Sequence, residues 1–152
     1  MAEAVDACAT LPLWPLDPAE CVDVLDAVVA AERRLAALKV RLVRRVDAAE
    51  VAQKQGATST AVWLRGRYRM AVGTARKLVE LARAVCAGPP VLRSAVARGE
   101  LLQEQVEAIT DTLAKIPLAN RVEAADRLVS EAAVWDARVL ALADKLERGT
   151  PF

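Results

Sequence analysis

The segment between Asp17 and Gly56 constrains the fold most, because no glycine and no proline beyond Pro18 interrupts it. Its apolar residues recur close to a heptad spacing, which predicts one helix of about 35 residues, roughly 50 Å long. Asp17 and Glu20 form a capping box at its start, and Gly56 ends it. A helix of this length must pack against several others or against a second copy of itself. The predicted seam consists of Leu25, Val28, Leu35, Leu38, Leu42, Val46 and Ala49.

The remaining sequence alternates helical periodicity with short breakers. Hydrophobic residues make up 55% of the chain but aromatic residues only 3%, which is typical of a helical protein rich in Ala, Val and Leu. We expect an all-α fold, a multi-helix bundle of about five to seven helices in which the last helix packs along the first. The predicted parts are an N-terminal tail (residues 1–16), a single helical domain (17–148) and the start of a linker (149–152). We expect Leu13, Trp14 and Leu16 of the tail to pack onto the bundle.

Breakers also delimit the helices of the second half. Gly99 separates a short helix over residues 91–98 from a longer one over residues 102–116. The last helix begins at Asn120, which forms a second predicted capping box with Glu123. Whether this helix breaks at Trp135–Asp136 stays open. Its predicted seam is Val122, Ala125, Leu128, Ala132, Trp135, Val139, Leu142 and Leu146.

The chain contains no histidine, the commonest general base and the commonest metal ligand. A Ser–His–Asp triad, a histidine-dependent zinc site and a histidine-dependent nuclease centre are therefore excluded for this chain. No glycine-rich phosphate loop occurs either. We expect no catalytic residue, no bound metal and no cofactor.

The cysteines and the N-terminus indicate a cytoplasmic protein. Cys8, Cys21 and Cys86 are odd in number and far apart, so we expect reduced thiols rather than a disulfide framework. The N-terminus is acidic where a signal peptide needs positive charge, and no apolar run is long enough to cross a membrane. We expect no membrane partner.

Charge is segregated along the sequence although the net charge is only +1. Residues 1–32 carry a charge of −7, residues 33–98 carry +12, and residues 99–152 carry −4. A basic centre of this size favours contact with a polyanion such as DNA. Acids at the start of the first helix and bases near its end also suit the helix dipole, which is the alternative explanation for part of the pattern.

The basic centre contains a helix-turn-helix pattern over residues 58–87, within the stretch Gly56–Ala87. Residues 58–60 offer N-caps, Val62, Trp63 and Leu64 are predicted core residues, and residues 70–73 form the predicted turn before a helix over residues 74–87. The five positions that such a motif needs apolar are Leu64, Tyr68, Met70, Ala75 and Leu78.

Two positions depart from the pattern of a DNA-binding helix-turn-helix. Arg65 stands where a small residue is usual, and Arg69 stands where glycine often makes the turn. The glycines occur instead at Gly66 and Gly73, so we expect the helices to cross at a shifted register.

If the motif binds DNA as such motifs do, its second helix enters the major groove. Thr74, Arg76 and Lys77 would then face base edges, while neighbouring arginines reach phosphates. The alternative is that Arg76, Glu80 and Arg83 form surface ion pairs and the arginines merely solvate the bundle. The candidate nucleic-acid-binding residues are Arg65, Arg67, Arg69, Thr74, Arg76, Lys77, Arg83, Arg41, Arg44 and Arg45.

Two motifs resemble a known family. They are G-A-x-S-T-A-x-W-L at Gly56–Leu64 and G-x-L-x-x-x-Q-V-x-x-I at Gly99–Ile109. The chain is similar to the domain-of-unknown-function 222 family, also called the thirteen-E-twelve repeat family of actinobacteria, from about Cys21 to Leu146. Members commonly carry an HNH endonuclease domain after this region, so the resemblance implies a DNA-associated role. The histidines of an HNH centre are absent from this chain.

We therefore expect a non-catalytic DNA-binding or DNA-positioning module, the N-terminal part of an HNH-endonuclease-like protein. Either the nuclease domain lies outside this chain, or the protein is a stand-alone or truncated relative. The alternative is a helical protein–protein interaction module without nucleic-acid binding, which forms a homodimer through the long N-terminal helix.

Overall fold

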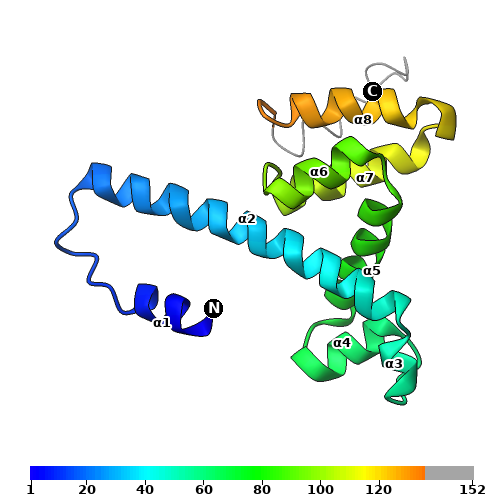
Figure 1. Cartoon of the computed structure of the whole chain (residues 1–152), viewed down its shortest axis with the longest axis horizontal. Coiled ribbons are helices and arrows are strands. Elements are labelled where there is room, and N and C mark those ends of the chain that lie inside the picture. Colours follow the sequence, from blue (N-terminus) through cyan, green and yellow to red (C-terminus); the bar gives the residue numbers. More distant parts are fainter. Residues whose placement is uncertain (136–152) are drawn as a thin grey trace. The chain divides into compact units, whose positions relative to one another are not determined.

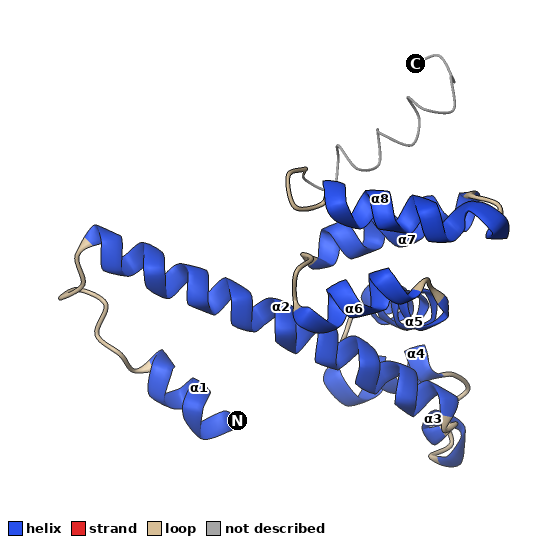
Figure 2. Cartoon of the chain, turned by 45° about the horizontal axis from the view of Figure 1, so that its top comes forward, coloured by secondary structure: helices blue, strands red, loops and turns tan. Residues whose placement is uncertain are grey.

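The computed structural model describes residues 1–135, and over these residues the chain is helical apart from its turns, which confirms the all-α class (Figure 1; Figure 2). It divides into two compact units, residues 1–32 and a unit that begins at Arg33. The described helices, eight α-helices and one 3-10 turn, exceed the expected number. They are α1 (Ala2–Ala9), α2 (Pro18–Ala48), α3 (Val51–Lys54), α4 (Thr60–Tyr68), α5 (Val72–Ala87), α6 (Pro90–Arg98), α7 (Gln103–Lys115), η1 (Leu118–Asn120) and α8 (Arg121–Glu131).

The predicted N-terminal tail contains a helix, α1, none of whose residues is buried. Local helix formation by its Ala-rich sequence therefore does not depend on a core contact. Leu13 and Trp14 are 64% and 89% exposed, and Leu16 is partly exposed. Their contact with the bundle would join the two units and stays a prediction.

Helix α2 begins as predicted but ends earlier. The backbone N–H of Glu20 donates to Asp17 Oδ1 at 2.8 Å, and that of Asp17 donates to Glu20 Oε2 at 2.9 Å, which confirms the capping box. The helix stops at Ala48 rather than at Gly56, because Glu50 adopts a left-handed φ of 54°. The ammonium of Lys54 donates to the carbonyl of Ala49, which the break leaves without a helical partner. Glycine usually occupies the left-handed region, so a glutamate at this position does not indicate a helix end in the sequence.

The face of α2 that enters the core is not the predicted heptad seam. The buried residues are Ala37, Val40 and Val43, whereas Leu38 and Leu42 of the predicted seam are 38% and 56% exposed. The small side chains of the buried face allow a close approach to neighbouring helices. A cavity of only about 20 Å³ is left among Ala37, Leu81, Val96, Val106 and their neighbours on α2, α5, α6 and α7.

Helix α5 is the centre of the unit that begins at Arg33. It packs against α4 at one end and against α6 and α7 at the other, as Figure 1 shows. Its buried residues form a continuous core with those of the other helices. This face consists of Ala75, Leu78, Val79, Leu81, Ala82 and Val85.

The last described helix, α8, packs mainly against α6 and α7, so the expectation that it lies along α2 is wrong for residues 121–131. Asn120 makes no side-chain cap, so the second predicted capping box is wrong as well. Asn120 belongs to a 3-10 turn with helical backbone angles, and an N-cap needs extended ones. Arg121 instead donates to the carbonyl oxygen of Ile116.

The predicted seam of the last helix is only partly confirmed. Ala125, Leu128 and Ala132 are buried, whereas Val122 and Trp135 are exposed. Helix α8 ends at Glu131, before the suspected break at Trp135–Asp136. The rest of that seam and the predicted linker lie outside the described residues.

Gly99 provides a test of this packing. It ends α6 with a φ of 70°, and a Cβ built on it would lie 2.9 Å from Arg34 Cγ and 3.2 Å from the Arg34 backbone nitrogen. We predict that Gly99→Ala lowers the free energy of unfolding by about 1–2 kcal/mol through its backbone conformation alone, with a further loss from the clash with α2. Urea denaturation measures this change.

Gly66→Ala is the matched control. Gly66 lies within α4 at an ordinary helical φ, and nothing lies within 4 Å of a Cβ built on it. The same substitution there should raise the free energy of unfolding by roughly 0.5–1 kcal/mol, because alanine favours a helix. Equal effects at the two glycines would contradict the close approach of Gly99 to α2.

Candidate nucleic-acid interface

The helix-turn-helix pattern corresponds to α4 and α5. Ser59 is the N-cap of α4, and its Oγ accepts from the backbone N–H of Val62 at 3.2 Å, so the predicted cap is confirmed. The turn covers residues 69–71 rather than 70–73, and α5 begins at Val72, two residues earlier than predicted. Gly73 is helical, so it does not break the second helix.

Arg69 makes the turn that glycine usually makes. It has a φ of 56° and a ψ of 33°, in the left-handed region that glycine favours. Arg69 therefore differs from the usual glycine in residue type but has the backbone conformation that the turn requires. Nothing lies within 4 Å of a Cβ built on Gly66 or Gly73, so neither glycine permits a closer crossing of the two helices. The expected shift of the crossing register has no basis in these glycines.

The apolar positions of the motif are mostly buried. Leu64, Ala75 and Leu78 lie in the core, and Met70 packs against it. Tyr68, by contrast, is 56% exposed. It therefore leaves an apolar ring on the surface near the turn.

The predicted core residues of α4 divide between inside and outside. Val62 is 49% exposed, which corrects its assignment to the core. Trp63 is partly buried, and its indole N–H donates to Gln55 Oε1 at 2.7 Å. The Trp63 ring also meets Tyr68 edge to face, with 6.1 Å between centroids, and the Arg67 guanidinium lies 5.4 Å from the Trp63 centroid. The chain's own aromatic rings thus hold Arg67.

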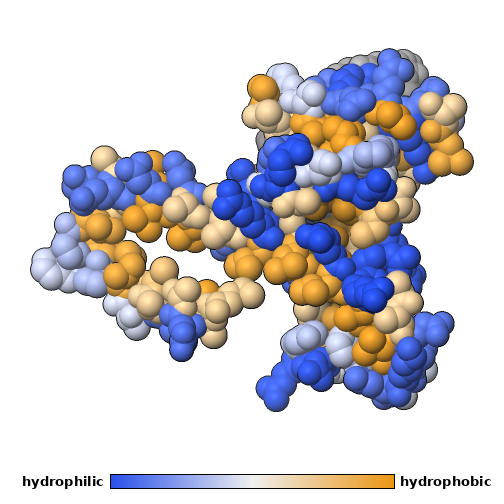
Figure 3. All heavy atoms as spheres, in the orientation of Figure 1, coloured by the Kyte–Doolittle hydropathy of each residue, from blue (hydrophilic) through white to orange (hydrophobic). Residues whose placement is uncertain are grey.

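Most of the predicted nucleic-acid-binding residues are exposed cations without a partner. Within residues 1–135, these side chains make no hydrogen bond or ion pair, and Thr74 beside them is exposed too. Hydrophilic side chains dominate the surface around α3 and α4 in Figure 3. The unpaired cations are Arg41, Arg45, Arg65, Arg69, Arg76 and Lys77.

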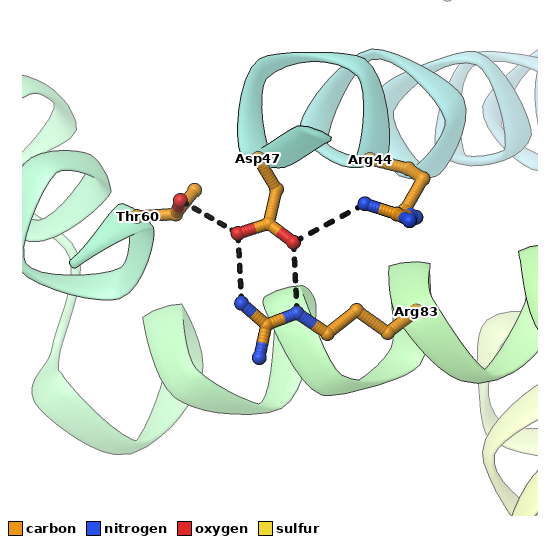
Figure 4. A network of polar contacts seen from close by, with 4 residues as sticks. All are labelled: Arg44, Asp47, Thr60 and Arg83. Atoms are coloured by element: carbon orange, nitrogen blue, oxygen red, sulfur yellow. Dashed lines mark hydrogen bonds and ion pairs between the residues drawn. The ribbon is translucent and has the colours of Figure 1, made fainter. Parts of the chain in front are cut away.

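Two of the predicted residues are bound to a carboxylate instead. Arg83 donates from Nε and Nη2 to the two oxygens of Asp47, each at 2.8 Å, and Arg44 Nη1 lies 3.4 Å from Asp47 Oδ2 (Figure 4). The hydroxyl of Thr60 donates to Asp47 Oδ1 at 2.8 Å. Asp47 thereby joins the end of α2 to the start of α4 and to the C-terminal half of α5.

Electrostatics match this geometry. The side chain of Asp47 is 8% exposed, and the hydrogen bond from Arg83 holds the pKa of its carboxyl below the ordinary value, aided by Thr60 and Arg44. The same contact raises the pKa of Arg83. Sequence reasoning missed this centre, although Asp47 is one of only three acids among residues 33–98. That isolation was the available signal.

Acidic groups border one side of α5. A groove of about 310 Å³ between α5 and α7 is lined by Lys77 together with Glu80, Glu107 and Asp111. These carboxylates place negative charge beside Lys77. No ion pair joins Glu80 to Arg76 or Arg83 within residues 1–135, so the alternative pairing is not seen there.

Other kinds of site find no support in the part of the chain that the structure describes. Its acids and cysteines form no group that could hold a metal ion. Its helices include none that combines the length and the apolar composition needed to cross a membrane.

Asp47→Asn tests the contribution of this carboxylate to stability. Because the folded-state pKa of Asp47 is lowered, its contribution is present above the unfolded value near 3.9 and is lost as the pH falls through the folded value. We predict that the variant is less stable than the native chain by about 1–3 kcal/mol at neutral pH, because Arg83 and Thr60 lose a charged acceptor.

The difference should shrink as the pH falls from about 4, where the carboxyl of the unfolded chain becomes protonated, through the lowered pKa of the folded chain. Thermal unfolding of both proteins as a function of pH measures it. Asp126→Asn is the control, since Asp126 is exposed and its side chain has no partner within residues 1–135. A pH-independent difference would show that the charge of Asp47 is not the cause.

The motifs that carry the family resemblance perform structural roles. Gly56 has a φ of 81°, and Thr60 is 2% exposed. The amide of Gln105, which is buried, donates to the carbonyl oxygens of Ala132 at 2.7 Å and Trp135 at 2.9 Å. Gln105 thereby fixes the end of α8 against α7.

Comparison with known proteins shows the family to which the chain belongs. Searches of curated proteins and of solved structures find no match. A family model described as "Domain of unknown function (DUF222)" matches residues 22–148, most of the chain. The chain therefore belongs to the domain-of-unknown-function 222 family.

Proposed function

We propose that this chain is a non-catalytic DNA-binding module that contacts the phosphate backbone through α4, the turn and the first two turns of α5. The observation that carries the proposal is the set of exposed, unpaired cations around the turn. The sequence between Glu50 and Glu80 contains six bases and no acid. A polyanion approaching this surface meets no carboxylate of that segment.

The roles of the individual residues follow from their positions. Arg65 and Arg69 lie at the end of α4 and in the turn, where arginines reach phosphates in DNA-binding helix-turn-helix proteins. Thr74 and Arg76 are exposed at the start of α5, the helix end that meets base edges in such proteins. Arg44 and Arg83 act through Asp47, as positioning residues for the helix pair.

The resemblance to proteins that carry a nuclease supports the wider part of the proposal. The chain would position DNA for an HNH-type nuclease domain that lies outside it, in a cytoplasmic protein. This chain contributes no histidine to such a centre. Its own contribution is therefore binding and orientation.

A second candidate function is self-association. The specific observation in its favour is the predicted heptad seam of α2, of which Leu35, Leu38 and Leu42 are all exposed. This function needs no nucleic acid and does not compete for the α4–α5 surface.

Binding to a labelled random-sequence duplex, measured by fluorescence anisotropy over a series of salt concentrations, tests DNA binding. The logarithm of the binding constant should fall linearly with the logarithm of salt concentration, with a slope of about −0.9 per phosphate contacted. Arg76→Gln and Arg69→Gly should each weaken binding and each reduce the slope by about 0.9. Arg69→Gly keeps the fold, since glycine suits its left-handed backbone.

Lys115→Gln is the matched control. Lys115 is exposed at the end of α7 and away from the turn, and its loss changes the net charge as much as either test variant does. It should leave the slope unchanged. Absence of binding at low salt would overturn the proposal, and so would an equal loss in the control, which would mean that only net charge matters.

A further inference from the structure

Helix α2 has a second apolar face in addition to the one in the core. Its residues follow the a and d positions of a heptad from the first turn onward, and every one of them is exposed. Figure 3 shows hydrophobic side chains along one edge of the first half of the helix. The face consists of Cys21, Val24, Val28, Ala31, Leu35, Leu38 and Leu42, and we call it the α2 seam.

The seam and the buried face lie on opposite sides of the helix. Leu35 and Leu38 each precede a buried residue, Ala37 or Val40, by two positions, and two positions correspond to about 200° around a helix. The core of the chain's own fold therefore cannot cover the seam in residues 33–48. A continuous apolar stripe on an exposed helix face favours burial against a further partner.

The charges that flank the seam indicate what the partner is. Residues 18–32 carry Glu20, Asp23, Asp26 and Glu32 and no base. Residues 33–48 carry six bases and one acid, Asp47, which is held within the fold. Two copies of α2 side by side in antiparallel orientation place each acidic half against a basic half, whereas a parallel pair places like charges together.

The heptad register fits the same arrangement. Antiparallel coiled coils set a positions opposite d positions. About a twofold axis midway between Ala31 and Leu35, the pairs are Ala31 with Leu35, Val28 with Leu38, Val24 with Leu42, and Cys21 with Arg45. Three successive layers on each side of the axis are apolar, and the polar layer falls at the ends.

We propose that α2 pairs with α2 of a second copy of this chain, antiparallel and in this register. The seam becomes the centre of a symmetric interface in which each copy contributes the same residues. The proposal does not depend on DNA binding, because none of its residues belongs to the α4–α5 surface.

Cysteine cross-linking tests both the pairing and its direction. In a background with Cys8→Ser and Cys86→Ala, the remaining Cys21 is exposed. In the antiparallel register, the two Cys21 residues are separated along the helix axis by the length of 24 residues, about 36 Å. This distance is far too long for a disulfide bond. The background should therefore stay uncross-linked under mild oxidation, and adding Arg45→Cys should give a covalent dimer on a non-reducing gel.

A matched control moves the thiol around the helix. Cys21→Ser with Asp23→Cys places the first thiol about 200° from the seam while keeping Arg45→Cys. This variant should give little covalent dimer. A dimer formed by Cys21 alone would show a parallel pair and overturn the proposal.

Mass measurement by light scattering completes the test without DNA. The native chain should be a dimer that weakens as salt rises and whose thermal stability increases with protein concentration. The double variant Leu38→Glu with Leu42→Glu should be a monomer whose thermal stability is independent of concentration, since both residues are exposed on the chain itself. A native monomer at all concentrations overturns the proposal. If the double variant unfolds more easily than the native chain at a dilution where that chain is monomeric, another segment of the same chain covers the seam, which overturns the proposal as well.

Discussion

The carboxylate of Asp47 is the contact on which the candidate interface depends. It accepts hydrogen bonds from Arg83 on α5 and from Thr60 at the start of α4, while it ends the helix that carries Arg44 (Figure 4). Three helices thus share one nearly buried anion. A charged acceptor of this kind is strong when satisfied and costly when unpaired, so it fixes the mutual positions of α4 and α5. Two arginines that look available in the sequence are occupied by this contact.

The backbone at the turn shows why sequence rules were incomplete here. Arg69 and Glu50 both adopt left-handed angles without being glycine. Such conformations cost energy for a residue with a Cβ, so the sequence alone indicated a continuous helix at Glu50 and an irregular turn at Arg69. At Gly99 the same angles are carried by glycine, and there the predicted helix end is correct. Gly56 also has a positive φ, but it follows the short helix α3 and not the long helix that we predicted to end there.

Local periodicity predicted the helices well and their packing less well. The buried face of α5 and the caps at Asp17 and Ser59 depend on neighbouring residues, and the sequence revealed them. The face of α2 that enters the core depends on which helices approach it. Small residues there allow closer packing than the leucines of the seam, so hydrophobicity alone selected the wrong face. The exposure of the basic residues was predictable, but the engagement of Arg83 by Asp47, 36 residues away, was not.

The leucines of α2 that we predicted to be core residues from their hydrophobicity are exposed in the structure. Different residues therefore serve different roles. Small residues build the fold, Asp47 holds the α4–α5 pair, exposed cations surround the turn, and the α2 seam is exposed on the chain itself. The family motifs belong to the building of the fold, since Gly56, Gly99 and Gln105 all serve the backbone or its packing. Membership of the family therefore accounts for the fold. Whether the exposed surfaces bind DNA or a second copy must be tested directly.

The central claim, that α4, the turn and the start of α5 form the DNA-binding surface, is tested most directly by NMR. Backbone amide shifts of the labelled chain would be followed while a duplex is added at low salt. The account predicts that the largest changes fall on residues 65–77 and that the amides of the acidic face of α7 stay unchanged. Changes centred on α6, α7 or α8, or no changes at all, would contradict it.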